Sequence, residues 1–332
     1  MRVLAAADKF KGTATAAQVC AAIGHACWSL NIDCTEIPLA DGGEGTLAVL
    51  GGANRTSTVT GPLGTPVQAE WRLHRGTAVI EMAQASGLTL AGGPDRNDPL
   101  NATTRGTGEL IDQALNAGAK KIIVCLGGSA TTDGGLGALK AISTPARLLA
   151  VEFLVACDVD TTFVDAARVF APQKGASRAQ VELLTGRLGK LAQTFKNDYN
   201  VDVTAIPGSG AAGGLAGALV ALGAKLIPGF DLVADETGFY DAVKNHDLIV
   251  TGEGLLDDTS YEGKVVGNVQ QLARDAGRDC LAIVGDIDEN ISTVEAQELR
   301  TLSLTQLFGS DDAHKNVLRR IEDAMLNYLK TL

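Results

Sequence analysis

Residues 2–46 read RVLAAADKFKGTATAAQVCAAIGHACWSLNIDCTEIPLADGGEGT, and this stretch decides the fold class. The apolar run over residues 2–7 predicts a buried strand, and residues 15–29 carry a helical pattern. A second apolar run over residues 34–40 predicts another strand, which leads into a glycine-dense loop. A strand, a helix and a second strand in this order form a βαβ unit, which indicates a parallel sheet.

Three further apolar runs, near the end of the chain, continue the same pattern. They cover residues 248–251, 280–284 and 302–307, and a helical pattern over residues 265–276 joins the first two. The five strands together predict a flavodoxin-like, doubly wound parallel sheet. Because a long insertion separates the first two strands from the last three, we expect one discontinuous domain made of residues 1–51 and 245–332.

The insertion, residues 52–244, predicts a second α/β domain with a mixed sheet. Its first part contains three short runs, at residues 56–60, 67–73 and 77–82, whose glycine-containing connections suit antiparallel hairpins. Its second part contains a buried strand at residues 121–126 and helical patterns at residues 107–117, 181–194 and 214–222. In such a two-domain plan we expect the ligand in the cleft, where loops at the carboxyl ends of strands meet it.

Composition and charge exclude several classes of protein. The net charge is −11 and no Lys/Arg cluster is present, which argues against a nucleic-acid partner. No apolar run approaches the roughly 20 residues of a spanning helix, and the start of the chain does not read as a signal peptide, so we expect a cytoplasmic protein without membrane attachment. The six cysteines form no CxxC pair and predict reduced, buried thiols. The four histidines share no metal-ligand spacing, and we predict neither a zinc site nor a catalytic triad around them.

The loop Asp41-Gly42-Gly43-Glu44-Gly45-Thr46 follows the second predicted strand. Its glycines allow the backbone to approach a ligand closely, and two carboxylates and a hydroxyl project nearby. A purely structural interpretation also fits, in which the loop is a turn into a helix with Asp41 as its N-cap.

The loop Gly127-Gly128-Ser129-Ala130-Thr131-Thr132-Asp133-Gly134-Gly135 follows the buried strand at residues 121–126. A glycine-rich turn between a strand and a helix aims backbone N–H groups and the helix dipole at one point, which favours an anion. Phosphate binding is therefore our hypothesis for this loop, and an elaborate helix start is the alternative.

The loop Gly208-Ser209-Gly210-Ala211-Ala212-Gly213-Gly214 matches the pattern GxGxxG. A dinucleotide-binding fingerprint needs a clear strand before it and an acidic residue about 20 positions later. Asp231 lies near that distance, but Pro207 directly precedes the loop and the run at residues 201–206 is short. We interpret the loop as a second phosphate or backbone-approach loop. No GxxxxGK[ST] motif is present in the sequence, so the chain is not a P-loop kinase.

Several charged residues stand at tight turns or at the starts of predicted helices. Arg105 and Lys174 could hold a substrate carboxylate or a transferring phosphoryl group, although a solvated surface role fits each of them equally well. Glu253 and Asp257 follow the third strand of the first domain and offer oxygen ligands.

Taken together, these loops resemble the glycerate kinase family of bacteria, the type with a flavodoxin-like domain and an inserted second α/β domain. The matching segments run in the same order along the chain: residues 40–46, 59–64, 80–83, 103–111, 127–131, 133–135, 156–159, 172–176, 208–214 and 251–254. The chain departs from the family pattern at Lys9, where a small hydroxyl residue is usual, and at Leu255, where an arginine is usual. It is also shorter between Ile142 and Val155, where we expect a hairpin and a glycine-rich turn to be missing.

The resemblance implies phosphoryl transfer from ATP, with Mg²⁺, to a hydroxyl of D-glycerate, giving 2-phosphoglycerate. It also implies roles for the residues of the matching loops. The expected catalytic residues are Asp41, Asp133, Asp158 and Lys11. The expected ATP-binding residues are Gly127, Gly128, Ser129, Gly208, Ser209, Gly210, Gly213 and Gly214. Arg105, Lys174, Gly42 and Gly43 are expected to bind glycerate, and Glu253 and Asp257 to hold Mg²⁺.

The sequence leaves three alternatives: a family member that binds a hydroxy acid or nucleotide without turnover, a kinase of another hydroxy acid, and a dehydrogenase using the loop at residues 208–214. The oligomeric state is left open.

Overall fold

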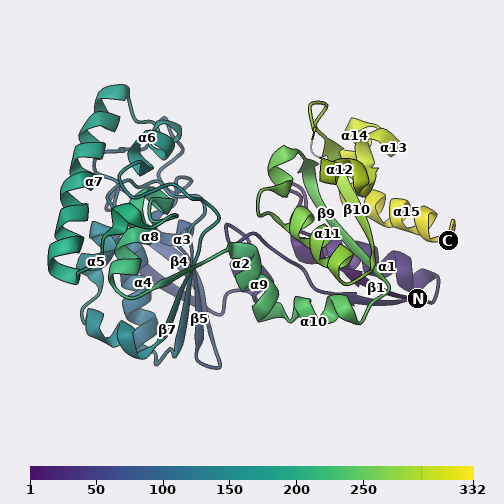
Figure 1. Ribbon diagram of the computed structural model, residues 1–332, viewed down its shortest axis with the longest axis horizontal. Coiled ribbons are helices and arrows are strands. Elements are labelled where there is room, and N and C mark those ends of the chain that lie inside the picture. Colours follow the sequence, from purple (N-terminus) through teal and green to yellow (C-terminus); the bar gives the residue numbers. More distant parts are fainter. Residues whose placement is uncertain (293) are drawn as a thin grey trace. The chain divides into compact units, whose positions relative to one another are not determined.

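The computed structural model describes residues 1–292 and 294–332, and the chain divides into two compact units (Figure 1). Unit 1 comprises Met1–Asp41 and Phe230–Leu332, and unit 2 comprises Gly42–Gly229. The chain passes from unit 1 to unit 2 and back, and we call these two points the crossings. The sequence places them later, at residues 52 and 244, and that domain assignment stays a prediction.

The short helix α2 (Thr46–Val49) shows why the first crossing is early. The main-chain N–H groups of Gly45 and Leu47 donate to Glu81 of unit 2, which binds the start of the helix to that unit. Helices α9 (Gly229–Thr237) and α10 (Phe239–Lys244) follow the second crossing, and the rings of Phe230 and Phe239 pack edge to face.

Unit 1 is built on a five-stranded sheet whose strands are all parallel, in the order β11-β10-β9-β1-β2. The strands are β1 (Arg2–Ala5), β2 (Asp33–Glu36), β9 (Leu248–Leu256), β10 (Asp279–Ile287) and β11 (Arg300–Ser303). The connected helical elements are α1 (Ala16–Ser29), η4 (Asp258–Tyr261), α11 (Val265–Asp275), α12 (Val294–Glu298), α13 (Leu304–Phe308), α14 (Ser310–Lys315) and α15 (Val317–Leu329).

Alternate residues of β10 show that helices cover both faces of this sheet. Leu281 and Ile283 share a core with α1 and α15, whereas Ala282 and Val284 share a core with Val266 of α11. The predicted doubly wound, flavodoxin-like architecture is therefore confirmed. Strand order along the sheet reverses between β1 and β9, and in such sheets this switch point is where ligands bind, at the carboxyl ends of the strands.

One predicted strand is only partly correct. Residues 302–307 were expected to be extended, but β11 ends at Ser303 and residues 304–308 form the helix α13. The cause is a cap, because the Ser303 side chain accepts a hydrogen bond from the N–H of Gln306.

Unit 2 contains a six-stranded mixed sheet in the order β3-β4-β5-β6-β7-β8. Its strands are β3 (Arg55–Thr60), β4 (Pro66–His74), β5 (Thr77–Glu81), β6 (Lys121–Cys125), β7 (Glu152–Ala156) and β8 (Lys225–Ile227). The pairs β3–β4 and β4–β5 are antiparallel, as predicted, and β5 to β8 are parallel. The sequence did not predict β7 and β8.

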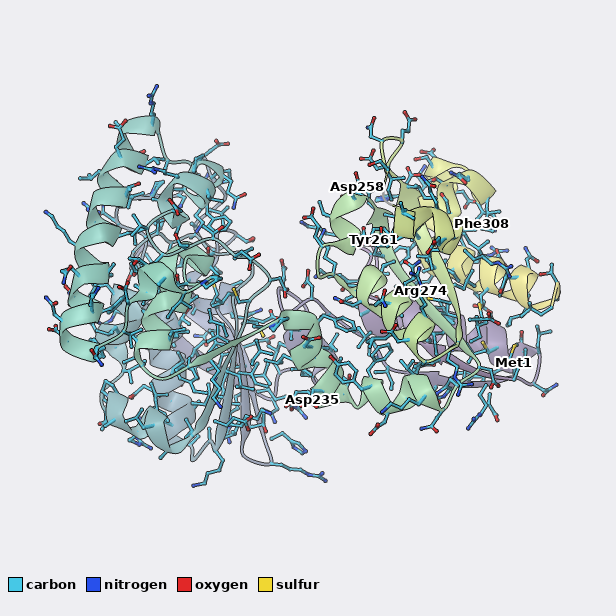
Figure 2. The ribbon with its side chains drawn as sticks, viewed as in Figure 1. Met1, Asp235, Asp258, Tyr261, Arg274 and Phe308 are labelled. Carbon is cyan, nitrogen blue, oxygen red and sulfur yellow. The ribbon has the colours of Figure 1, made fainter. Side chains whose placement is uncertain are left out.

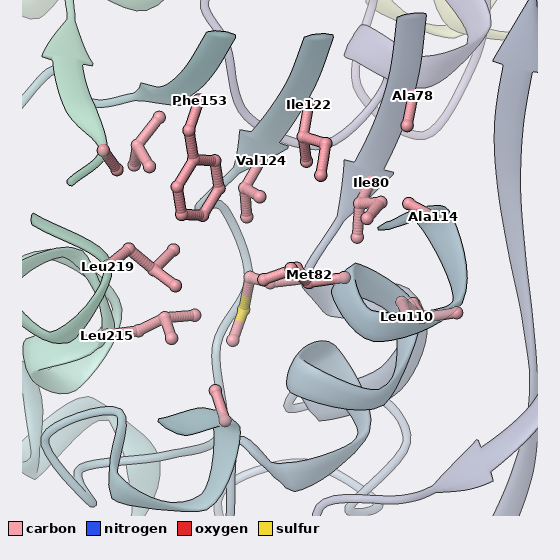
Figure 3. Close-up of a cluster of buried hydrophobic side chains, with 14 of the residues drawn as sticks. Ala78, Ile80, Met82, Leu110, Ala114, Ile122, Val124, Phe153, Leu215 and Leu219 are labelled. Atoms are coloured by element: carbon pink, nitrogen blue, oxygen red, sulfur yellow. The ribbon is translucent and has the colours of Figure 1, made fainter. Parts of the chain in front are cut away.

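Helices pack on this sheet over a continuous apolar core (Figure 3). The helical elements of unit 2 beyond α2 are α3 (Ala83–Ser86), α4 (Arg105–Asn116), α5 (Leu136–Ala141), η1 (Pro145–Ala150), α6 (Ala166–Phe170), η2 (Pro172–Lys174), α7 (Arg178–Tyr199), η3 (Val203–Ala205) and α8 (Ala211–Ala221). Leu110 of α4 and Leu219 of α8 share the core with Ile80, Met82 and Val124 at the carboxyl half of the sheet. Truncating one such side chain to alanine costs about 2–5 kcal/mol, so the core fixes where the loops after β5 and β6 begin.

Two further expectations concern membranes and thiols. No helix within residues 1–292 and 294–332 is long and apolar enough to cross a bilayer. All six cysteines are free thiols, three of them buried and three partly exposed.

Candidate active site

In unit 1, carboxylates gather where β1, β2 and β9 end. We call Asp8, Asp41, Glu253 and Asp257 the carboxylate cluster. Asp8 follows β1, Asp41 ends the segment after β2, and Glu253 lies on β9 beyond its pairing with β1. Since β1 and β9 flank the switch point of the sheet, the cluster lies at the position where a doubly wound sheet binds its ligand.

The pKa values of two members of the cluster are raised. Burial raises the pKa of Asp8 to about 6, with the neighbouring Asp41 adding to the rise and Lys9 and Lys264 opposing it. Burial raises the pKa of Glu253 to about 7, and the charges of Asp8 and Asp257 add to it. Carboxylates that repel one another in a largely buried position are stabilised when a cation or a proton binds there. The raised pKa values therefore indicate a site for one or the other.

Asp257 and Lys11 lie at the edges of this cluster. Asp257 is the N-cap of η4, where its Oδ1 accepts from the N–H of Ser260 and the hydroxyl of Thr259, and these bonds hold the pKa of Asp257 below its usual value. Asp258 and Tyr261 begin and end this 3-10 turn (Figure 2). The main chain of Lys11 lies beside Gly254 of β9, and the Lys11 side chain is exposed.

In unit 2, the loop after β6 holds the predicted phosphate-binding residues. Gly128 is exposed and Ser129 is half-buried, whereas Lys174 from η2 is only 2% exposed. The Lys174 Nζ donates to the Ser129 Oγ at 2.7 Å and to the Thr131 carbonyl at 2.6 Å. Burial lowers the pKa of Lys174 to about 7, and the negative charge of Asp133 opposes this shift. The structure therefore brings Ser129, Lys174 and Asp133 together, and their predicted roles stay predictions.

Main-chain and side-chain donors surround the carboxylate of Asp133. Its carboxylate accepts hydrogen bonds from the main-chain N–H of Thr104, Gly135 and Gly137 at 2.9–3.1 Å and from the Thr104 hydroxyl. Burial raises its pKa, and the same N–H donors pull it the other way. These bonds make Asp133 an anchor between the starts of α4 and α5, and its predicted catalytic role stays a prediction.

The loop at residues 208–214 packs directly on the loop after β6. A Cβ on Gly213 would lie 2.0 Å from the Thr131 carbonyl oxygen, and the N–H of Gly134 donates to the carbonyl of Gly213. Ala212, Gly213 and Gly214 have φ of 53°, 67° and 91°, so this turn runs through the left-handed region. Close backbone approach is thus a sufficient reason for these glycines.

Two other residues of this loop are explained by local structure. The Ser209 hydroxyl is fully buried and donates to the carbonyls of Val203 and Ile206. Gly208 and Gly210 face the side chain of Cys157 and the carbonyl of Thr162 at distances that leave no room for a Cβ. No strand precedes the loop, since residues 203–205 form η3, and this disfavours a dinucleotide fingerprint.

The loop at residues 42–45 also belongs to this edge of unit 2. A Cβ on Gly127 would lie 2.8 Å from the Glu44 nitrogen and 3.0 Å from the Gly43 Cα, so the two glycine loops are in contact. Gly42 packs against Gly229 and Ala156. Glu81, which is 4% exposed, holds this loop through its Oε1, which accepts from Gly45 and Leu47 at 2.8 Å each.

The remaining predicted residues of unit 2 lie at the same edge. Arg105 is the first residue of α4, and its Nε donates to Glu109 at 2.9 Å while about half of the side chain stays exposed. Asp158 follows β7 and accepts a 2.6 Å hydrogen bond from the N–H of Gly229. The sequence motifs did not single out Asp8 or Glu81 as site residues. Asp8 and Glu81 do stand within or beside segments that carry the family resemblance, which is the signal that could have found them.

The residues of unit 1 fit Mg²⁺ in part. No group of three or more His, Cys, Asp or Glu side chains converges as a metal site within the described part of the chain. Kinase sites commonly hold Mg²⁺ by one or two carboxylates together with substrate phosphates. Glu253 fits this role, since its Oε1 is buried without a hydrogen-bond partner among the described residues and Asp8 lies near it. Asp257 fits less well because its Oδ1 caps η4.

A flavodoxin-like unit with carboxylates at its switch point and a second unit with a glycine-rich loop between a strand and a helix are compatible with an α/β kinase that lacks a P-loop. The model of the glycerate kinase family matches residues 3–146 and 143–332. The chain therefore belongs to the glycerate kinase family, and it is a kinase.

Individual relatives match most or all of the chain. Glycerate 2-kinase of Escherichia coli is 36% identical, with 100% of this chain and 98% of that protein covered. Glycerate kinase of Halalkalibacterium halodurans is 39% identical over 88% of this chain and 87% of its own length. The crystal structure of a protein assigned as glycerate kinase 2, from Salmonella typhimurium LT2, superposes with a TM-score of 0.87 at 34% identity, covering 100% and 98% of the two chains.

The alignment with the Escherichia coli protein is longer than this chain. The alignment with the Escherichia coli protein spans 374 positions against 332 residues here, so at least 42 positions have no residue in this chain. The two matches to the family model meet at residues 143–146, where the sequence predicts the missing segment. In the structure, η1 (Pro145–Ala150) makes a short link from α5 to β7 at this place.

Proposed function

We propose that this enzyme transfers the terminal phosphoryl group of ATP to the 2-hydroxyl of D-glycerate, giving 2-phosphoglycerate and ADP. The observation that carries the proposal is the glycine-rich loop Gly127-Gly128-Ser129 after β6, whose Ser129 hydroxyl accepts a hydrogen bond from the buried Lys174 ammonium. The identity of the substrate and of the phosphorylated hydroxyl comes from the full-length similarity to a glycerate 2-kinase.

In the proposed reaction, the hydroxyl oxygen of glycerate forms a bond to the γ-phosphorus, and the bond from that phosphorus to the bridging oxygen of ADP breaks. The transition state is largely dissociative, so the protein contributes chiefly by placing the reactants and neutralising charge. We assign the phosphates to the backbone of Gly127, Gly128 and Ser129. Arg105, exposed at the start of α4, is our candidate for the carboxylate of glycerate.

We assign metal binding and proton acceptance to the carboxylate cluster of unit 1. Glu253 and Asp8 would hold Mg²⁺, which neutralises the phosphate oxygens when it is bound. Asp41, close enough to Asp8 to raise the pKa of that carboxyl, is our candidate to accept the hydroxyl proton as the new bond forms. Lys9 and Lys264 lower the pKa of Asp8, and they balance the negative charge of the cluster.

The test is to incubate the protein with ATP, Mg²⁺ and D-glycerate and to follow ADP release and the phosphorylated product by ³¹P NMR. Glycerate-dependent formation of 2-phosphoglycerate is the expected result. Formation of 3-phosphoglycerate would keep the kinase and overturn the choice of hydroxyl. Turnover with another hydroxy acid but not with glycerate would overturn the substrate.

A second candidate function is binding without turnover, and the 42 or more missing positions favour it. Calorimetry distinguishes the two candidates, because a binding protein would retain affinity for ADP or D-glycerate while producing no phosphorylated product.

A further inference from the structure

Lys174 was predicted to bind substrate, but its side chain has almost no surface for that purpose. It is 2% exposed, and its Nζ donates to the Ser129 Oγ at 2.7 Å and to the Thr131 carbonyl at 2.6 Å. An ammonium group has only donors, so the Ser129 oxygen must be the acceptor in the first of these bonds.

This direction of donation fixes what the Ser129 hydroxyl can do. One of the two acceptor positions of its oxygen takes the Lys174 proton, which turns its own O–H away from Lys174 and leaves it to donate. Among the described residues Ser129 has no acceptor for that proton, while the side chain is half-buried and the preceding Gly128 is exposed. The O–H group is therefore available to a ligand at the exposed side of the loop.

Both partners of the Lys174–Ser129 bond are held by other bonds. The backbone on either side of Ser129 pairs with the segment around Gly87, through bonds from Leu88 N to Gly128 O at 2.8 Å and from Ala130 N to Ser86 O at 3.0 Å. The side-chain amide of Asn97 donates to the carbonyl of Ala130 at 3.0 Å and to that of Lys174 at 2.9 Å.

Asn97 thus connects the segment that carries Ser129 with the segment that carries Lys174, and the side chains of these two residues form the hydrogen bond. Such a network fixes the distance and the direction between an ammonium and a hydroxyl, which a surface lysine on a flexible stem does not achieve.

We propose that Lys174 is a positioning residue that acts through Ser129: its ammonium group fixes and polarises the Ser129 hydroxyl so that the hydroxyl donates to an anionic oxygen of the bound substrates. This inference rests on the proposed function. The anionic oxygen belongs either to a phosphate of ATP or to the carboxylate of glycerate. A hydroxyl that accepts from a cation is a stronger donor than a free hydroxyl, and an anionic acceptor gains most from it.

The test is a double-mutant cycle with Lys174→Met, Ser129→Ala and the double variant, read as kcat/KM and as thermal stability. Each single variant is expected to lose about 10–100-fold in kcat/KM. The double variant should be no slower than Ser129→Ala, because Lys174 has no other route to the substrate. Lys174→Met should lower the melting temperature in both backgrounds, since the Thr131 carbonyl loses its donor. Losses in kcat/KM that multiply in the double variant would overturn the proposal.

A second measurement avoids substitution of the buried lysine, whose loss could prevent folding. The ammonium form of Lys174 is present below its pKa of about 7, and Asp133 is the charged group that acts on it. Wild-type kcat/KM should therefore decline as pH rises through about 7, and Ser129→Ala should lack this decline while Ser129→Thr retains it. An unchanged decline in Ser129→Ala would contradict a role through the hydroxyl.

The source of the anionic oxygen follows from the Michaelis constants. A rise in KM for ATP alone in Ser129→Ala assigns the hydroxyl to a phosphate, and a rise in KM for glycerate alone assigns it to the carboxylate. If the wild type binds ADP and D-glycerate without turnover, the proposed function fails, and the same cycle is read from calorimetric affinities. Unchanged affinity for both ligands in Ser129→Ala would then overturn the inference itself.

Discussion

The main-chain N–H of Asp8 donates a 2.9 Å hydrogen bond to the carbonyl of Gly252, the residue before Glu253. The bond from Ala6 N to Val250 O, at 2.7 Å, precedes it on the same pair of strands. The ladder between β1 and β9 thus continues past the last residue of β1 and brings two carboxyl groups of raised pKa to the switch point.

Protonation of these two groups should inactivate the enzyme in acid. The pKa values of Asp8 and Glu253 are about 6 and about 7, so both carboxyls lose their charge as pH falls through that range. We expect kcat/KM to decrease as pH drops below about 7, measured at a Mg²⁺ concentration well below saturation, because bound cation would itself lower both pKa values. Glu253→Gln should lower kcat/KM by roughly 100-fold, and Glu262→Gln, an exposed neighbour, should have no effect. A flat profile between about pH 5.5 and 7.5 would contradict the role of the cluster.

The same Glu253→Gln variant should be more stable than the wild type in mild alkali. The folded chain raises the pKa of Glu253 from 4.5 to about 7, so it binds the proton more tightly than the unfolded chain does. The stability from that proton is present below pH 4.5 and is lost as pH rises through about 7. Glutamine removes this loss, and we expect a gain of roughly 1–3 kcal/mol at about pH 8 by denaturant unfolding. If the variant showed no gain in unfolding free energy over the wild type at that pH, the Glu253 carboxylate would have to be more exposed to water than the structure shows.

Glu81 should hold the glycine loop that begins unit 2. Gly45, the N-cap of α2, has no side chain of its own, and the carboxylate of Glu81 replaces it by accepting from Gly45 and Leu47. Glu81→Leu should cost about 2–3 kcal/mol of stability and speed hydrogen exchange at these two amides. Glu81→Gln keeps an acceptor oxygen and should lose less than half of that. Equal losses in both variants would point to the charge rather than the cap.

Gly213→Ala should strongly destabilise the folded protein, because a Cβ there would lie 2.0 Å from the Thr131 carbonyl oxygen and φ is 67°. We expect a loss of at least about 3 kcal/mol, or failure to fold. The matched control is Gly186→Ala in the middle of α7, where a Cβ meets nothing within 4 Å. That change should stabilise the protein by about 0.5–1 kcal/mol. A mild effect of Gly213→Ala would mean that the two loops can move apart.

Asp133→Asn separates anchoring from catalysis. The amide keeps one oxygen but turns its NH₂ group toward main-chain donors of Thr104, Gly135 or Gly137. We expect a stability loss of about 2–4 kcal/mol, measured by urea unfolding. Thr132→Val is the control, since the buried Thr132 hydroxyl has no partner among the described residues and its removal should be nearly neutral. Full stability of Asp133→Asn together with a large loss of kcat would favour the predicted catalytic role.

The strands that the sequence predicted well are those whose formation depends on residues close together in the chain. The antiparallel strands β3, β4 and β5 follow from alternation and glycine turns, and β1, β9 and β10 from apolar runs. The strand β8 is only three residues long and pairs with β7 alone, so no local pattern marks it. The helix α13 depends on one cap by Ser303, which the apolar run at residues 302–307 conceals.

The site was predictable as loops but not as individual side chains. Nothing in the sequence around Lys174 says that this lysine is buried, because its burial comes from contacts with segments more than 40 residues away. The importance of Asp8 depends on strand order, which places β1 beside β9 although some 240 residues separate them in the chain.

The short link η1 has a practical consequence. It enters β7 at Glu152, whose N–H is bonded to Lys120 O just before β6 begins, so it lies at the amino end of these strands and the glycine loops lie at the other. Leu149 in this link is 78% exposed. The two matches to the family model meet at residues 143–146, just before this link, and we therefore expect the link to tolerate an insertion. A cysteine at position 149 would accept a fluorescent label or surface tether that reports on unit 2 from the end away from the candidate phosphate loop.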